Sequence, residues 1–348
     1  MGDDNCPSKS SVKHLGLSNI KKALQILASL ALGIVILYWL FDKENLDWTS
    51  FKAELTTINW FWIILGIINL QLSWLYRAIR WQMQIEAIDR RYALLDLWAA
   101  SIAGVAINYL IPRSGELLKC VWVGNKTGSS TSRLIGTVVT ERAIDVLCLL
   151  LIVCIGFFLE YDVLISFLLE EAKVPYWLFY LGLFGGAFGL ASLFVIKRLA
   201  KRKGGIFAKL WHLVVALWEG IISVKKLKRP LLFIALTLLI WSSYVLMQYL
   251  VFFAYPPASN FGFEVALIVF IFSSFGIVVP TPGGIGSFQF FAQTALVLYG
   301  MASTSALFFA NIIFWPFVIS NIVFGTIGFL IISNVPYKSK SIENAEAQ

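Results

Sequence analysis

Charged side chains are scarce in this sequence. Asp, Glu, Lys and Arg make up 14% of its 348 residues, whereas a soluble domain typically carries about 25%. Hydrophobic residues reach 59%, and the mean hydropathy is +0.78. This balance leaves no room for a sizeable soluble domain. It indicates an all-α polytopic integral membrane protein whose main solvent is the lipid bilayer.

Metal-binding and redox-active residues are equally rare. The chain has two histidines, His14 and His212, and four cysteines with no CxxC spacing. We therefore expect neither a metal site nor a disulfide framework, and no cofactor. Basic residues outnumber acidic ones by 28 to 20. They cluster beside hydrophobic segments, which indicates the positive-inside pattern of membrane proteins and not nucleic-acid binding.

Long apolar runs alternate with polar connections. A membrane-spanning helix needs ~20 apolar residues. Six segments meet this requirement: 23–42, 58–80, 134–160, 175–197, 230–254 and 304–332. They belong to one transmembrane domain, 23–332, between polar ends at 1–22 and 333–348. Residues 206–224 place apolar side chains at helical spacing between basic clusters, which predicts an amphipathic helix in the membrane interface.

Two further apolar stretches are broken by proline and glycine. The first, 93–124, stops at PRSG and continues for about 9 residues, or ~14 Å of helix, which is too short to cross a bilayer. The second, 263–300, is interrupted by VPTPGGIGSFQ at 279–289. Irregular backbone persists at membrane depth only where protein buries it or where it lines a wet cavity. We therefore predict two re-entrant helical hairpins; the alternative is plain loops at the membrane surface.

The basic clusters also define an orientation. With the N-terminus in the cytoplasm, the basic segments 77–91 and 197–229 fall on the cytoplasmic side, and the acidic loop after residue 160 falls outside. Both termini are then cytoplasmic, and the two hairpins enter from opposite faces. The halves 23–160 and 175–332 each contain span, span, hairpin and span, so the second half is inverted. Inverted repeats with broken helices are typical of transporters.

Charged residues within a span cost about 2.5–3.5 kcal/mol at the helix centre. The third predicted span carries Glu141, Arg142 and Asp145, and Glu141 and Asp145 share a helix face because they are four residues apart. The first hairpin adds Arg113 at its tip and Glu116 just after it. Arginine can meet a phosphate bidentately, and the carboxylates could balance it or recognise an amine. The alternative is a set of buried ion pairs, such as Arg142–Glu116 or Arg113–Asp145, that only fixes helix register.

Four short motifs occur in order along the chain. They are R-x-x-R-W (Arg77, Arg80, Trp81), N-x-L-I-P-R-x-G-E (Asn108 to Glu116), E-R-x-x-D (Glu141 to Asp145) and P-T-P-G-G-I-G (Pro280 to Gly286). Together they resemble the lysylphosphatidylglycerol synthase transmembrane region, also called the flippase-like domain family, over roughly residues 20–332. The resemblance implies a bacterial or archaeal cytoplasmic-membrane protein that moves lipids between leaflets.

In the bifunctional synthases, a membrane part like this one flips aminoacylated phosphatidylglycerol made by a cytosolic aminoacyltransferase domain. We expect this chain to lack that domain, and therefore we expect no enzymatic lysyl transfer by it alone. The family often has an acid shortly after the glycines, where this chain has Gln289. A hydrogen-bonding role remains open to Gln289, whereas a proton-carrying role does not.

The sequence thus predicts translocation of an anionic or aminoacylated phospholipid, or of a polyprenyl-phosphate lipid, through a polar cavity. The expected substrate-binding residues are Arg80, Asn108, Arg113, Glu116, Glu141, Arg142, Asp145, Thr281, Gly283, Gly284, Gly286 and Gln289. Two alternatives remain. One is an enzyme that acts within the membrane on a lipid. The other is a scaffold that holds a partner lipid-modifying enzyme, docked by 206–224. The oligomeric state stays open.

Overall fold

The computed structural model describes residues 30–44, 48–111, 114–166 and 227–333, and the regular elements in these ranges are helices. Four of them are long and apolar enough to span a membrane: α3 (Trp60–Glu86), α6 (Thr131–Leu159), α10 (Pro230–Phe252) and α13 (Ser303–Ser333). They confirm four of the six predicted spans. The predicted span 175–197 and the amphipathic helix 206–224 lie outside the described residues.

The long helices begin where the sequence supplies starting signals. The Asn59 side chain accepts a hydrogen bond of 3.2 Å from the backbone N–H of Phe61 and so caps α3. Pro230 stands at the first position of α10, where a backbone N–H would have no acceptor within the helix, so proline costs no hydrogen bond there. Helices α3 and α10 pack along each other, and the Asn69 amide donates to the Ser243 carbonyl at 2.6 Å.

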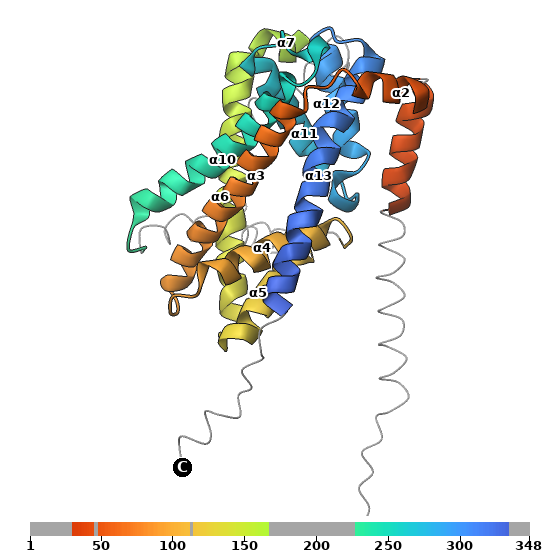
Figure 1. Ribbon diagram of the computed structural model, residues 1–348. Helices are drawn as coiled ribbons and strands as arrows, with labels where there is room; N and C mark the ends of the chain where they lie inside the picture. Colours follow the sequence, from red (N-terminus) through yellow and green to blue (C-terminus); the bar gives the residue numbers. More distant parts are fainter. Residues whose placement is uncertain (1–29, 45–47, 112–113, 167–226, 334–348) are drawn as a thin grey trace, which may run out of the picture.

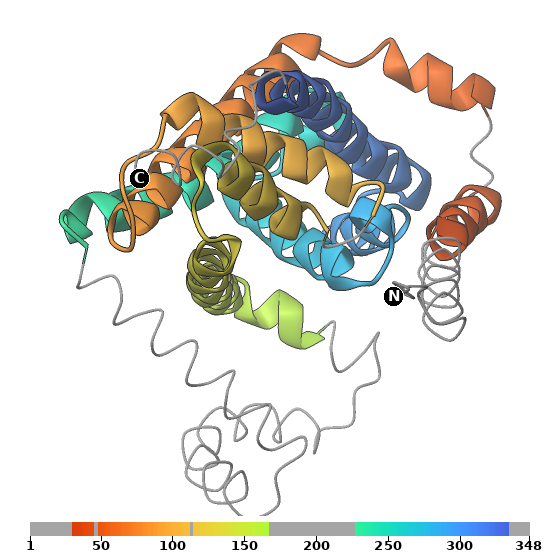
Figure 2. The ribbon, with the colours of Figure 1, turned by 90° about the horizontal axis from the view of Figure 1, so that it is seen from below.

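Four shorter helices form two helix-turn-helix pairs: α4 (Leu94–Asn108) with α5 (Gly115–Thr127), and α11 (Phe263–Val278) with α12 (Ser287–Leu298). The two pairs occupy opposite ends of the long helices (Figure 1). Seen from below, α4 and α5 lie side by side across the end of the bundle (Figure 2). The short second helix that the sequence predicts at 116–124 is therefore present, and it is slightly longer than expected.

Glycine lets the helices of each pair touch near their connection. A Cβ atom on Gly104 would lie 2.6 Å from the Gly115 carbonyl oxygen, and one on Gly276 would lie 2.7 Å from the Ser287 carbonyl oxygen. Both values are shorter than a Cβ contact can be, so the backbones meet directly. In each pair, a glycine near the end of the first helix faces the first residue of the second helix.

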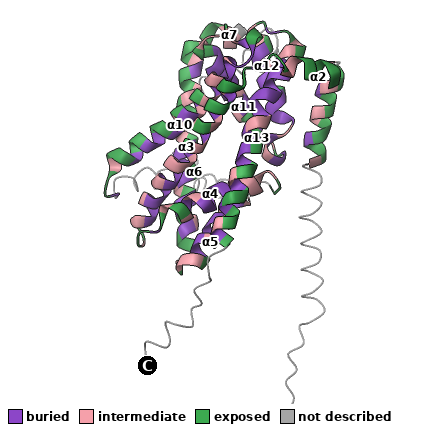
Figure 3. Ribbon diagram, viewed as in Figure 1, coloured by how far each residue is buried: buried purple, intermediate pink, exposed green. Residues whose placement is uncertain are grey.

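The largest apolar core lies among α10, α11, α12 and α13, where buried residues concentrate (Figure 3). Its aromatic centre stacks Tyr255 on Phe309 at 5.3 Å and sets Phe252 edge-on to Phe309 at 5.1 Å. A smaller core beneath α4 and α5 contains Trp81 and Leu97, both fully buried. The two cores hold the two helix pairs against the long helices, at opposite ends of the bundle.

A peripheral helix covers residues 30–43, and α2 (Trp48–Leu55) follows it. The sequence predicts only a loop at 43–57, whereas the structure places α2 within it. The Glu44 carboxylate accepts hydrogen bonds from Ser303 at 2.7 Å and Gln293 at 3.0 Å. These bonds hold the end of the peripheral helix against α12 and α13.

Candidate functional site

Five charged side chains from three helices form a buried cluster, which we call the ion cluster. Its members are Arg77 and Arg80 on α3, Lys119 on α5, and Glu141 and Asp145 on α6. Arg80 and Glu141 are fully buried, and the other three side chains are at most 8% exposed. Burial of an unpaired charge costs several kcal/mol, so the mutual pairing of these groups decides whether the fold tolerates them.

Each carboxylate in the cluster has its two shortest contacts with two different cations, and Arg80 also donates to Glu141 at 3.4 Å. Glu141 accepts from Arg77 at 2.6 Å on one oxygen and from Lys119 at 2.9 Å on the other. Asp145 accepts from Arg77 at 3.0 Å and from Arg80 at 2.9 Å, again on separate oxygens. Arg77 therefore bridges both carboxylates, and the cluster ties α3, α5 and α6 together.

Sequence spacing explains why these groups converge. Arg77 and Arg80 are three apart and Glu141 and Asp145 are four apart, so each pair lies on one helix face. Trp81, next to Arg80, donates to the Thr137 hydroxyl at 2.8 Å and presents its ring 4.4 Å from the Lys119 ammonium. This cation–π contact positions the lysine of the hairpin over the cluster.

A second ion pair, between Arg142 and Glu116, is more exposed than the ion cluster. Arg142 lies 3.0 Å from Glu116 and 3.6 Å from Asp145, and its side chain is 45% exposed. It joins the hairpin helix α5 to α6 at the edge of the ion cluster. Together the two sets contain four cations and three carboxylates, which leaves a net charge of +1.

A cavity of about 530 Å³ opens beside these charges. Its wall is formed by both helix pairs together with α3, α6, α10 and α13. Its charged lining consists of Arg77, Glu116, Lys119, Arg142 and Asp145. Cationic groups in a confined, low-dielectric space attract an anion more strongly than they would in water, so the cavity suits a phosphate group.

Four buried polar groups of cavity-lining residues have no hydrogen-bond partner within the part of the chain that the structure describes. They are Arg77 Nε on α3, Ser101 Oγ on α4, and Trp241 Nε1 and Gln248 Nε2 on α10. A buried unsatisfied donor costs ~1–3 kcal/mol.

The segments that connect the helices within each pair meet at the cavity. Asn108 accepts a hydrogen bond of 2.8 Å from the backbone N–H of Gly115 and so fixes the first connection. Gly283, with φ +59°, lies against the Tyr109 ring, and a Cβ atom there would overlap the ring. Asn108, Tyr109 and Gly283 all line the cavity. The connection of the second helix pair thus contacts the end of α4 at the cavity.

The remaining predicted residues of the second tip hold its shape. The hydroxyls of Thr281 and Ser287 are 2.9 Å apart, and Ser287 also donates to the Gly276 carbonyl at 2.7 Å. Gln289 is fully buried and accepts a 2.8 Å hydrogen bond from the N–H of Gly286. Gly284 and Gly286 have positive φ angles of 84° and 81°, which favour glycine.

The structure thus brings Arg80, Glu141 and Asp145 together, and it places Glu116 and Arg142 beside them. The expected Arg142–Glu116 pair is present, whereas Glu141 and Asp145 are balanced mainly by Arg77, Arg80 and Lys119. Arg113 lies outside the described residues.

Arg77 and Lys119 are the cluster members that the sequence analysis missed. The signal for Arg77 was its spacing from Arg80, which places both guanidinium groups on one face of α3. Among the described residues, no group of three or more His, Cys, Asp or Glu side chains could hold a metal ion.

Comparison with known proteins gives the chain its family. Residues 26–324 match the family described as the lysylphosphatidylglycerol synthase TM region. A UPF0104 membrane protein of Pyrococcus horikoshii is 22% identical over 142 residues, which cover 40% of this chain and 41% of that protein. The match therefore spans less than half of the relative's length. No solved structure matches the chain. The family match includes both helix pairs, the ion cluster and most of α13, so this multi-pass membrane protein belongs to the lysylphosphatidylglycerol synthase TM region family.

Proposed function

We propose that the protein translocates an anionic or aminoacylated phospholipid, or a related lipid phosphate, between the leaflets of its membrane. The observation that carries the proposal is the cavity of about 530 Å³, whose lining contains both charged side chains and residues with donors that have no partner among the described residues. In a chain of this hydropathy, such a cavity offers the headgroup a polar route through the hydrocarbon.

In this proposal the two helix pairs are re-entrant hairpins that enter from opposite faces of an inverted repeat, with both termini in the cytoplasm. The lengths of the helices support it. At 15, 13 and 12 residues, α4, α5 and α12 reach ~18–23 Å, which is less than the ~30 Å hydrocarbon core. The positions of the pairs at opposite ends of the bundle also agree with it (Figure 1).

Arg142 and Gln248 are the proposed headgroup contacts. Arg142 is half-exposed at the cavity, so its guanidinium can exchange Glu116 for a phosphate without unfolding the cluster. Gln248 is 1% exposed, lines the same cavity, and has an amide nitrogen without a partner among the described residues. In this proposal the ion cluster holds the helices around the cavity, and the open pair meets the substrate.

The test is headgroup-labelled lipid flip in proteoliposomes, with phosphatidylglycerol, lysyl-phosphatidylglycerol and a polyprenyl phosphate compared. We expect the native protein to flip one of these lipids. Arg142→Ala and Gln248→Leu should each lower the rate about ten-fold, which corresponds to ~1.4 kcal/mol. Thr326→Val is the matched control, because Thr326 is exposed on α13 and bonds only within its own helix.

The other outcomes point to the remaining functions. Chemical change of the lipid in the vesicles would indicate an enzyme. A monodisperse native protein that neither flips nor alters any of the three lipids would contradict translocation. That result would favour a scaffold for a partner enzyme, a role for which the expected docking segment 206–224 lies outside the described residues.

A further inference from the structure

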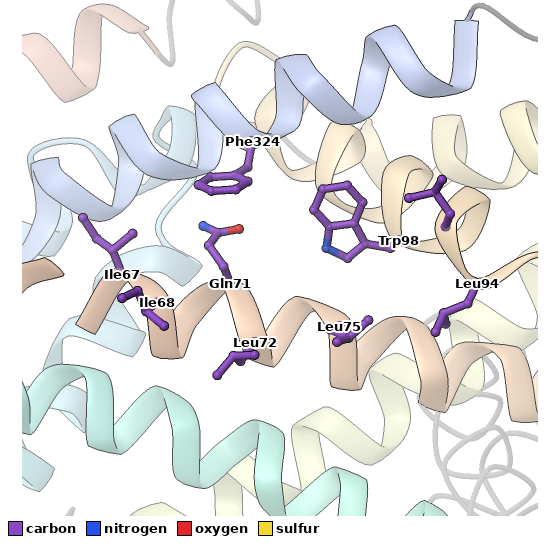
Figure 4. Close-up of a pocket in the computed structure, with 9 residues that line it drawn as sticks. Ile67, Ile68, Gln71, Leu72, Leu75, Leu94, Trp98 and Phe324 are labelled. Carbon is purple, nitrogen blue, oxygen red and sulfur yellow. The ribbon is translucent and has the colours of Figure 1, made fainter. Parts of the chain in front are cut away.

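An apolar groove runs along the α3–α13 contact, on the opposite side of these helices from the cavity. Two adjoining hollows of about 580 and 660 Å³ form it, and they share Ile67 and Phe324. Figure 4 shows the first hollow, with Gln71 as a polar side chain among Ile, Leu and aromatic residues. Trp98 on α4 lies in the first hollow, and Trp48 on α2 lines the second.

The groove is longer than one leaflet is deep. On α3 it extends from Trp60 to Leu75, which is ~22 Å along the helix at 1.5 Å per residue. Half of a ~30 Å hydrocarbon core is ~15 Å. An acyl chain lying in this groove could therefore remain in contact with the protein while its headgroup passes from one leaflet towards the other.

Two side-chain hydrogen bonds between α3 and α13, which we call the polar layer, lie between the groove and the cavity. Gln71 Nε2 donates to Ser320 Oγ at 2.8 Å, and Trp74 Nε1 donates to Asn321 Oδ1 at 3.1 Å. Gln71 and Ser320 line the groove, whereas Trp74 and Asn321 line the cavity. Asn321 also donates to the Tyr109 hydroxyl at 3.2 Å, so the layer connects to the point where the hairpin tips meet.

The proline within α13 would allow this helix to bend and the two hydrogen bonds of the polar layer to break. Pro316 stands inside α13, one turn before Ser320, and an interior proline removes a backbone hydrogen bond and permits a kink. Beyond it, Cβ atoms on Gly325 and Gly328 would lie 2.9 Å and 2.6 Å from carbonyl oxygens of α4. The C-terminal part of α13 is therefore packed on α4, and two side-chain hydrogen bonds connect it to α3.

We propose that the groove binds the acyl chains of a membrane phospholipid, and that Gln71–Ser320 and Trp74–Asn321 form a lateral gate for its headgroup. The proposal rests on the proposed function, whose cavity supplies the headgroup site. Charge complementarity selects this occupant. The groove wall is apolar, and the cavity behind the gate has a net charge of +1, so a molecule with long apolar chains and one anionic phosphate fits both.

The test closes the gate covalently. In a background whose four native cysteines are replaced by alanine, Gln71→Cys and Ser320→Cys are joined by a short, reducible bis-methanethiosulfonate. A benzoylphenylalanine in place of Phe270, an aromatic that lines the cavity, captures radiolabelled phosphatidylglycerol on irradiation in proteoliposomes. We expect the cross-link to lower capture at least about ten-fold, and we expect reduction to restore it.

The matched control joins α3 to α10 instead, through Asn69→Cys and Ser243→Cys, and its cross-link should leave capture unchanged. Equal capture with the gate cross-linked would overturn the gate, because lipid would then reach the cavity by another route. If the same vesicles still flip lipid in that case, the proposed translocation stands and only the gate is overturned. Absence of both capture and flip in the reduced protein would overturn the gate and the translocation together.

Discussion

Glu141→Gln is expected to lower the free energy of unfolding by about 3–5 kcal/mol, because it leaves three buried cations to share the single carboxylate of Asp145. The loss should appear as a large fall in the thermal unfolding midpoint in detergent micelles. Arg142→Ala is the matched control on the next residue of α6. Its guanidinium is half-exposed, so its removal should change stability by no more than about 1 kcal/mol.

A second substitution separates charge imbalance from loss of packing. Lys119→Met in the Glu141→Gln protein returns the net charge of the ion cluster to +1, its native value. We expect the double variant to regain part of the lost midpoint. If Glu141→Gln is no more destabilising than Arg142→Ala, the buried pairing described here does not hold the helices together.

Gly115→Val is expected to have an effect of similar size by a different route. A side chain at Gly115 would overlap the backbone carbonyl of Gly104 on α4, and neither backbone can move without separating the helices. Such overpacking should lower the free energy of unfolding by about 3 kcal/mol or more. Gly136→Ala is the control, because nothing lies within 4 Å of a Cβ atom at Gly136 on α6.

The two glycine variants should also differ in expression and monodispersity. We expect Gly136→Ala to be neutral or slightly stabilising, because alanine favours a helix over glycine by up to ~1 kcal/mol. Size-exclusion chromatography and thermal unfolding of both proteins provide the measurement. A Gly115→Val protein as stable as Gly136→Ala would show that α4 and α5 do not pack through their glycines.

The long helices could be predicted because a span is set by the length of an apolar run. The apolar run predicts α13 at 304–332, and the structure has Ser303–Ser333. The predicted second span ends at residue 80, whereas α3 continues to Glu86. The difference has a physical cause: Arg77 and Arg80 belong to the basic segment that the charge pattern places on the cytoplasmic side, but the ion cluster buries them, so the helix extends past them.

The candidate site was harder to predict, because its contacts connect distant parts of the chain. Helical spacing correctly indicated that Glu141 and Asp145 share a face. Their partners Arg77 and Arg80 lie 61 to 68 residues earlier, and one sequence contains no information on which distant cation meets which carboxylate. The pair of Arg142 with Glu116, which the sequence does suggest, is present at 3.0 Å at the edge of the cavity, and Arg142 also lies 3.6 Å from Asp145.

The order of the ion cluster along the chain has a consequence for biogenesis. Helix α3 is synthesised before α5 and α6, so Arg77 and Arg80 are made before Lys119, Glu141 and Asp145. Because α6 supplies both carboxylates of the cluster, a chain that stops before Glu141 contains two arginines without the carboxylates that pair with them in the folded protein.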